Sequence, residues 1–184
     1  RLAKIFCKKT FAEKVFFSNS GAEAVEAAVK TARKHAYVNI SKKKNEIVAF
    51  SDAFHGRTMM AIALNGSDRF IEGYGPMPGG IKHHQFNEMK NLEKTINKNT
   101  AAVVIELVQG EAGIIKAKKT FIQKIKKLCK QHKALIIVDE VQSGAGRTGT
   151  LFAYEQFGIK PDIMCCAKGI GGGIPIGAVL TSSK

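Results

Sequence analysis

Cysteine is scarce in this sequence, with four residues among 184. Cys7, Cys129, Cys165 and Cys166 are too few and too irregularly spaced for a disulfide framework or a zinc site. Cys165 and Cys166 are neighbours in an apolar run, where successive side chains point to opposite faces, so the pair cannot hold one metal. We therefore expect reduced packing residues and no metal site.

Long apolar runs are also absent. No run approaches the roughly 20 residues that a membrane-spanning helix needs, and residues 1–10 lack the apolar region of a signal peptide. The composition, 45% hydrophobic and 24% charged, is that of an ordinary globular domain with one core. We expect a cytoplasmic protein that has no membrane partner.

Acidic residues are few: 15 Asp and Glu stand against 29 Lys and Arg, which gives a formal net charge of +14. A basic face concentrated in one place is typical of nucleic-acid binding. Here the lysines fall in separate clusters, at residues 42–44, 116–119 and 124–133, and each is expected on a solvated surface. We expect no nucleic-acid partner; a basic nucleic-acid-binding module remains the alternative from another functional class.

The chain does contain short β-rich apolar runs that alternate with segments of helical period. This alternation is typical of βαβ units, so it predicts an α/β fold with a mainly parallel sheet and helices on both faces. The predicted strands are residues 14–17, 46–50, 101–108, 134–138, 162–166 and 177–181, and the predicted helices are residues 22–36, 58–64, 89–97 and 120–132. Residues 1–184 are expected to form one domain of a longer protein, because the last apolar strand has no helix to cover it.

The first candidate site is the junction between the strand at residues 14–17 and the helix that follows it. Ligands of an open α/β sheet bind outside the carboxyl ends of the strands. Ser20 and Glu23 have the spacing of a capping box, and Gly21 and Ala22 leave the first N–H groups of the helix uncovered. Free N–H groups at the positive end of a helix dipole suit a phosphate, and a plain helix start is the alternative.

The second candidate is Asp139, which follows four apolar residues at the end of a predicted strand. A buried carboxylate needs a cationic partner or several hydrogen-bond donors. A protonated pyridine nitrogen is such a partner, and that proton is what makes pyridoxal phosphate an electron sink. A helix or turn cap is the alternative.

The third candidate is Lys168, which emerges from an apolar strand into a loop with glycines at residues 171–173. A lysine in low dielectric has a lowered pKa and a nucleophilic amine, as Schiff-base chemistry requires. A solvated strand end is the alternative. Gly21, Asp139 and Lys168 together supply a phosphate cradle, a pyridinium partner and an aldehyde-binding amine for one cofactor.

Two further patterns predict no site. Residues 144–149 fit the dinucleotide pattern GxGxxG, but no long helix follows and no acidic residue lies about 20 positions later, so we expect a loop. His83 and His84 are adjacent and would point apart in a strand, which makes them a poor metal pair.

Five segments, at residues 18–24, 54–58, 109–111, 139–142 and 167–169, resemble in order the motifs of class III aminotransferases, which are pyridoxal-phosphate enzymes of fold type I. The likeness covers nearly the whole chain and is strongest to the acetylornithine group. It implies the large cofactor-binding domain of that fold, a homodimer, and pyridoxal 5'-phosphate as cofactor. The family's N-terminal segment and C-terminal small domain are expected to lie outside these residues.

The resemblance also implies roles for single residues. Cofactor contacts fall on Gly21, Ala22, Phe54, Asp139, Glu140, Val141, Gln142 and Lys168. Asp139 and Lys168 would be catalytic, the first at the ring nitrogen and the second as the covalent anchor. Arg57 would take a substrate carboxylate, and Glu111 would answer to an arginine of the C-terminal part. Leu107 departs from the family's usual proline, a change expected to affect the local turn more than the chemistry.

The implied reaction moves the terminal amino group of N-acetylornithine to 2-oxoglutarate, in arginine biosynthesis. Ornithine, 4-aminobutyrate and succinyldiaminopimelate aminotransferases and glutamate-semialdehyde aminomutase share the motifs. An inactive fragment that serves only as an interaction surface is a further alternative. Activity of these 184 residues alone is not implied.

Overall fold

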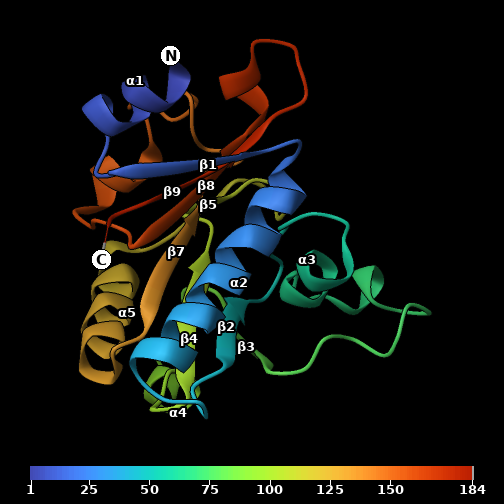
Figure 1. The fold of residues 1–184 in the computed structure, drawn as a ribbon. Helices are drawn as coiled ribbons and strands as arrows, with labels where there is room; N and C mark the ends of the chain where they lie inside the picture. Colours follow the sequence, from blue (N-terminus) through green and yellow to red (C-terminus); the bar gives the residue numbers. More distant parts are fainter. Residues whose placement is uncertain (184) are drawn as a thin grey trace.

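A computed structural model describes residues 1–183, which fold around a seven-stranded sheet flanked by helices (Figure 1). The strands are β1 (Lys14–Ser18), β2 (Glu46–Phe50), β3 (Ile81–His84), β4 (Thr100–Ile105), β5 (Val108–Gln109), β6 (Ile115–Lys116), β7 (Leu135–Asp139), β8 (Ile163–Ala167) and β9 (Gly177–Thr181). The helices are α1 (Leu2–Lys9), α2 (Gly21–Asn39), α3 (Met59–Leu64), α4 (Leu92–Thr95) and α5 (Lys119–His132), with short 3-10 turns η1 (Asp68–Phe70), η2 (Ala153–Phe157) and η3 (Lys168–Gly171).

The large sheet has the strand order β1-β9-β8-β7-β4-β2-β3. Strand β9 runs antiparallel to both of its neighbours, β1 and β8, and every other neighbouring pair is parallel. The predicted mainly parallel α/β sheet is therefore confirmed. Because β1 and β8 both oppose β9, the carboxyl ends of all strands except β9 lie along one edge, which we call the carboxyl edge; the opposite one is the amino edge.

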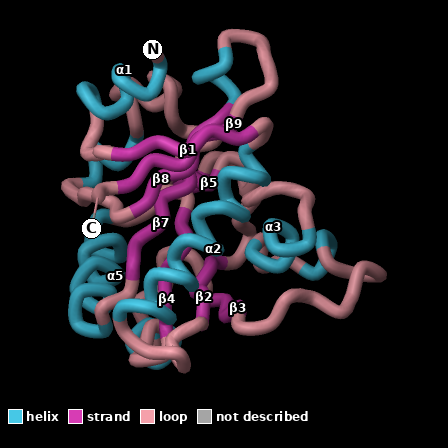
Figure 2. The backbone as a smooth tube through the Cα atoms, viewed as in Figure 1, coloured by secondary structure: helices cyan, strands magenta, loops and turns pink. Residues whose placement is uncertain are grey.

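Helices lie on both sides of the sheet (Figure 2), and each face of the sheet carries its own apolar core. Helix α2 covers one face with Ala24, Ala28, Ala32 and Ala36, all at most 1% exposed, because an alanine in every turn lets a helix approach the sheet closely. Helices α1 and α5 cover the other face. In β2, β7, β8 and β9, and in β4 from Ala102 onward, successive buried residues alternate between the two cores, as the period of a strand requires.

The adjacent cysteines follow this alternation. Cys165 lies in the core beneath α2 and Cys166 in the core beneath α5. Both thiols are free, and burial raises the pKa of Cys166 to about 12. The expectation that the pair points to opposite faces is confirmed. Among residues 1–183, no cluster of His, Cys, Asp and Glu could hold a metal ion, and no helix is long and apolar enough to cross a bilayer.

The predicted strand at residues 101–108 is wrong at its end. Strand β4 stops at Ile105, and Val108 pairs with Lys116 in a separate two-stranded sheet. The apolar run continues through Leu107 because that side chain is fully buried in the core beneath α5. Buried residues therefore continue past the end of the strand. An apolar run indicates which residues are buried, but it does not indicate where the strand ends.

Two other elements differ from the expectation. The helix predicted at residues 89–97 is a single turn, α4, which begins after Asn91, a residue in the left-handed conformation (φ +60°). Just after its end, the Asn97 side chain donates to the Thr95 carbonyl and accepts the Asn99 N–H. The edge strand β3 was not predicted, because its sequence Ile-Lys-His-His has one apolar residue. It forms through parallel pairing with β2.

Candidate functional site

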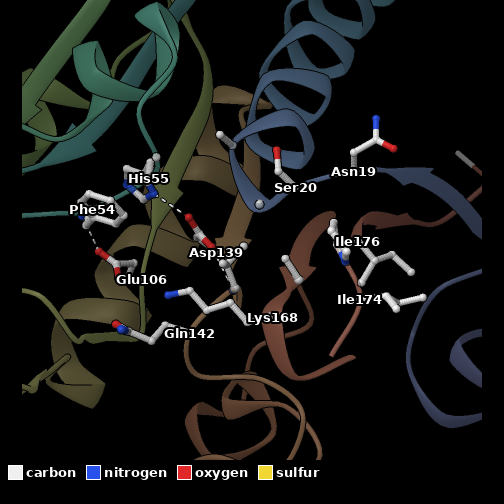
Figure 3. A pocket seen from close by; sticks show the side chains of 16 residues that line it. Asn19, Ser20, Phe54, His55, Glu106, Asp139, Gln142, Lys168, Ile174 and Ile176 are labelled. Atoms are coloured by element: carbon white, nitrogen blue, oxygen red, sulfur yellow. Dashed lines mark hydrogen bonds and ion pairs between the residues drawn. The ribbon is translucent and has the colours of Figure 1, made fainter. Parts of the chain in front are cut away.

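A cavity of about 270 Å³ opens at the carboxyl edge of the sheet (Figure 3). Segments that follow β1, β2, β4, β7 and β8, and the segment that precedes β9, form its walls. The lining residues are Asn19, Ser20, Gly21, Ala22, Phe54, His55, Gly56, Glu106, Asp139, Val141, Gln142, Ala167, Lys168, Ile174, Pro175 and Ile176.

The N-terminus of α2 forms one wall. The Ser20 hydroxyl accepts a hydrogen bond from the Glu23 N–H (3.1 Å), and the Glu23 carboxylate reaches back to the Asn19 N–H (2.5 Å). These bonds satisfy donors around the helix start and leave the N–H groups of Gly21 and Ala22, at the positive end of a 19-residue helix, without a partner among residues 1–183. The wall is suited to a negatively charged oxygen group.

Asp139 and His55 form a buried pair at the floor of the cavity. Asp139 is 4% exposed; its Oδ2 lies 2.8 Å from His55 Nδ1, and its Oδ1 accepts the Val141 N–H at 3.0 Å. Burial alone lowers the pKa of His55, but the hydrogen bond and charge of Asp139, together with Glu106, outweigh burial and raise it. His55 Nε2 is buried and has no hydrogen-bond partner among the described residues.

Phe54 and Glu106 form the adjacent wall. The Glu106 carboxylate accepts the backbone N–H of Phe54 at 2.9 Å, and Figure 3 shows this bond beside the ring of Phe54. Phe54 packs edge-on against Phe70, with ring centroids 5.8 Å apart. The cavity therefore has an aromatic ring held at both its backbone and its edge.

Lys168 lies across the cavity between Asp139 and Gln142 (Figure 3). It follows directly after β8 with a positive φ of +47°, a conformation that disfavours most residues other than glycine. The sequence suggested that Lys168 lies in a low-dielectric environment. In the structure Lys168 is exposed, so this expectation is wrong. An amine beside a buried carboxylate and a free helix N-terminus can still form a covalent bond with an aldehyde that also carries an anion.

Comparisons with known proteins agree with this arrangement. The family model of class III aminotransferases matches residues 1–184. This chain belongs to the class III aminotransferase family. Succinylornithine transaminase of Yersinia pseudotuberculosis is 50% identical over 190 residues, which covers 100% of this chain and 46% of that protein. The same enzyme of Salmonella paratyphi B is 50% identical over 182 residues, 99% of this chain and 45% of its own length.

Solved structures of related enzymes share the fold. Ornithine aminotransferase from Toxoplasma gondii superposes with a TM-score of 0.92 at 30% identity, over 98% of this chain and 44% of that one, and its active site holds pyridoxal phosphate at partial occupancy. An omega-transaminase from Thermomicrobium roseum gives 0.87 at 31% identity, over 100% of this chain and 45% of that one. The chain thus spans about half the length of the relatives it matches.

Most of the residues that the sequence analysis assigned to cofactor binding in this class III aminotransferase chain line the one cavity. These are Gly21, Ala22, Phe54, Asp139, Val141, Gln142 and Lys168. The side chain of Gln142 packs against the bare backbone of Gly110, since a Cβ there would lie 1.6 Å from Gln142 Oε1 in its present position. Residues far apart in the sequence therefore meet at one edge of the sheet.

Glu140, which the resemblance assigned to cofactor binding, does not line the cavity, and its role toward a cofactor stays a prediction. Its carboxylate accepts the Ser143 hydroxyl (2.6 Å) and the Tyr154 N–H (2.8 Å), and it is 1% exposed. Strand periodicity turns Glu140 away from the face that Asp139 occupies. Burial raises the pKa of Glu140, against the hydrogen bonds that lower it.

The two predicted substrate residues lie beside the cavity and outside its lining. Arg57 is exposed, and its guanidinium carbon lies 5.5 Å from the Phe54 ring centroid and 5.6 Å from that of Phe70. Glu111 is exposed in a neighbouring hollow and accepts the Gln142 side-chain amide at 3.4 Å. Arg57 and Glu111 therefore do not line the cavity themselves, but each contacts a residue that does.

His55 and Glu106 are site residues to which the sequence analysis gave no role. Each lies within or beside a recognisable segment, but the contact that matters joins residues 84 positions apart for His55 and Asp139 and 52 positions apart for Phe54 and Glu106. A polar residue inside an otherwise apolar run, as at Glu106 between Ile105 and Leu107, is the signal that could have identified one of them.

Two glycine patterns have different outcomes. Residues 144–149 lie in turns between β7 and η2, as expected for a loop. Of the three glycines at residues 171–173, only Gly171 lies close to a neighbour, since a Cβ there would approach Ile176 at 2.7 Å. Gly172 and Gly173 have positive φ and open space around them, so they are needed for the turn rather than for close approach.

Proposed function

We propose that this chain supplies the cofactor-binding domain of a pyridoxal 5'-phosphate-dependent aminotransferase. The observation that carries the proposal is the meeting of Lys168, Asp139 and the free N-terminus of α2 around one cavity. Each feature alone has an ordinary structural explanation. Together they match the three chemical groups of one molecule: an aldehyde, a ring nitrogen and a phosphate.

The shape of the cavity fits such a group. The backbone at Gly21 is closely packed: a Cβ there would lie 2.8 Å from Val141 Cγ1. The N–H groups of Gly21 and Ala22 would hold the phosphate, Phe54 would cover one ring face, and Asp139 would meet the ring nitrogen. The buried carboxylate of Asp139 already contacts His55 Nδ1 at 2.8 Å, and this contact raises the pKa of His55 against the lowering effect of burial. Asp139 thus brings to the cavity floor a carboxylate that can stabilise a positive charge.

The cofactor, when bound, supplies an electron sink for a carbanion next to nitrogen. The residues of this chain divide the remaining work. Lys168 would hold the aldehyde carbon, and its free amine could take up and release a proton. Asp139 would meet the ring nitrogen, and His55 orients the Asp139 carboxylate through their 2.8 Å contact. Phe54 would lie against the ring plane.

For the substrate, we propose an ornithine acylated on its α-nitrogen, with 2-oxoglutarate as acceptor. Relatives at 50% identity are named succinylornithine transaminase, and the sequence motifs are most similar to the acetylornithine group. Both donors present a terminal amine at one end and a carboxylate at the other. Arg57, exposed beside the Phe54 ring, is suited to that carboxylate. A cytoplasmic homodimer acting in arginine metabolism remains part of this proposal.

Covalent trapping tests the proposed function. The chain is incubated with pyridoxal 5'-phosphate, reduced with borohydride and digested, and the modified lysine is identified by mass spectrometry. We expect one modified lysine, Lys168, and none in Lys168→Ala. Lys133→Ala is the matched control, because Lys133 also has a left-handed backbone (φ +53°) but lies at the amino edge. Modification that persists in Lys168→Ala, or is lost equally in Lys133→Ala, would contradict the proposal.

A further inference from the structure

Glu106 is a buried carboxyl group in the wall of the cavity, and the reaction described above does not use it. The residue is 5% exposed, and its carboxylate has one backbone partner, the Phe54 N–H at 2.9 Å. A buried carboxylate ordinarily needs a cation or several donors. Glu106 is therefore costly to keep ionised and calls for an explanation beyond packing.

The chain direction fixes where Glu106 points. Ile105 and Leu107 on either side are at most 1% exposed and lie in the core beneath α5. Because neighbours in an extended chain point to opposite sides, Glu106 must face away from that core. It faces the cavity, between the carboxyl ends of β2 and β7.

Three charged groups face Glu106, each from a different segment. His55 follows β2, Asp139 ends β7 and Lys168 follows β8, and each acts electrostatically on the Glu106 carboxyl. Burial, the largest effect, raises the pKa of Glu106 to about 7; His55 and Lys168 oppose the rise and Asp139 adds to it. In return, the charge of Glu106 contributes to the raised pKa of His55. The four groups form one electrostatic unit around the cavity.

We propose that Glu106 is a positioning residue with two tasks: its carboxyl fixes the Phe54 peptide, and by exchanging one proton with solvent it sets the charge that His55 and Lys168 meet in the cavity. With the proton lost, the negative charge stabilises protonated His55 and the Lys168 ammonium. With the proton gained, Glu106 is neutral and both cations lose that support. Both tasks can be measured on the protein without a cofactor. Only an effect of Glu106 on a bound cofactor rests on the proposed function.

Two substitutions separate the tasks. Glu106→Gln keeps an oxygen acceptor for the Phe54 N–H but cannot ionise, whereas Glu106→Ala loses both the acceptor and the charge. Asp162→Asn is the matched control: the Asp162 carboxylate also accepts a backbone N–H, that of Ile136 at 2.7 Å, but at the amino edge. Thermal unfolding of each variant establishes that it is folded.

The test uses the cofactor-free chain and NMR titration from about pH 5 to about pH 9. In Glu106→Gln we expect the His55 titration midpoint to fall by roughly half a pH unit or more, because the neighbouring negative charge is gone. Asp162→Asn should leave this midpoint unchanged. The Phe54 amide resonance should stay in place in Glu106→Gln and move in Glu106→Ala.

The His55 titration and the Phe54 amide resonance each test one of the two tasks of Glu106. A His55 titration in Glu106→Gln that superimposes on the wild type overturns the charge-setting task, and an unmoved Phe54 amide in Glu106→Ala overturns the positioning task. The pH dependence of the absorbance of chain loaded with pyridoxal 5'-phosphate should shift in Glu106→Gln as well. If no cofactor is retained, the proposed function fails while the titration of His55 still stands as a test of Glu106.

Discussion

The two edges of the sheet use buried charges differently. At the amino edge, Lys44 is 3% exposed and donates to the backbone carbonyls of His132 (2.6 Å) and Lys98 (3.3 Å), while Asp162 accepts the Ile136 N–H. At the carboxyl edge, Asp139 and Glu106 line a cavity, and His55 Nε2 has no partner among residues 1–183. At the amino edge, the buried Lys44 and the half-buried Asp162 join chain segments, whereas the buried charges at the carboxyl edge leave capacity for a ligand.

The largest expected effect is a loss of cofactor affinity on substitution of Asp139 at the carboxyl edge. Asp139→Asn removes the negative charge that would pair with the ring nitrogen and that supports protonated His55. We expect its affinity for pyridoxal 5'-phosphate to fall roughly 100-fold, about 2.7 kcal/mol. Absorbance titration with the cofactor measures the affinity. Asp162→Asn, the corresponding change at the amino edge, should bind as the wild type does.

The difference between edges would disappear if Asp162→Asn weakened cofactor binding as much as Asp139→Asn. Such a result would mean that the loss of any carboxylate that accepts a backbone N–H loosens the whole sheet. Equilibrium unfolding of both variants in urea separates this outcome from a local effect at the cavity.

The next largest expected effect is a loss of stability on substitution of Lys44 at the amino edge. Lys44→Met keeps most of the buried aliphatic chain but leaves the carbonyls of Lys98 and His132 without their donor. We expect a loss of about 1–3 kcal/mol in the free energy of unfolding, as for other buried acceptors left unpaired. Denaturant unfolding measures the loss, and cofactor affinity should not change.

A useful control for Lys44→Met is Lys43→Met, because Lys43 is an exposed neighbour whose amine has no hydrogen bond or ion pair among the described residues. Its free energy of unfolding should change by less than about 0.5 kcal/mol. If both variants lost the same stability, the bonds to Lys98 and His132 would not be what stabilises the amino edge.

These contrasts show what the sequence could predict of the fold. The central strands were predictable because β4, β7 and β8 are buried on both faces and read as continuous apolar runs. The edge strand β3 was not, since it has exposed polar residues and depends on pairing with β2. The end of β4 was misplaced because burial continues past it through Leu107.

The candidate site divides in the same way. Gly21, Asp139 and Lys168 follow strands or begin a helix, so their positions at one edge could be inferred from chain order alone. Glu106 could have been noticed as a polar residue inside an apolar run, but neither its role nor that of His55 could be inferred, because their partners come from other segments and only the folded chain brings them together. The exposure of Lys168 was also missed, since an apolar strand predicts nothing about the loop after it.

The smallest expected effect concerns the fit between α2 and β7 at the cavity rim. In Gly21→Ala the new Cβ would lie 2.8 Å from Val141 Cγ1 and 3.0 Å from Cγ2, and a β-branched side chain has little freedom to turn aside. The start of α2 must therefore move by a few tenths of an ångström, which moves the N–H groups of residues 21 and 22. We expect cofactor affinity to fall by about three- to tenfold, about 1 kcal/mol.

The double variant Gly21→Ala/Val141→Ala sharpens this prediction, because removing the two methyl groups of Val141 removes the clash. Its affinity should return toward that of Val141→Ala alone. Gly79→Ala is the control, since nothing lies within 4 Å of a Cβ at that position. If Gly21→Ala binds normally, or if the double variant does not recover, then the backbone at the start of α2 is not held in place by Val141, and the carboxyl edge is less rigidly packed than the short contact implies.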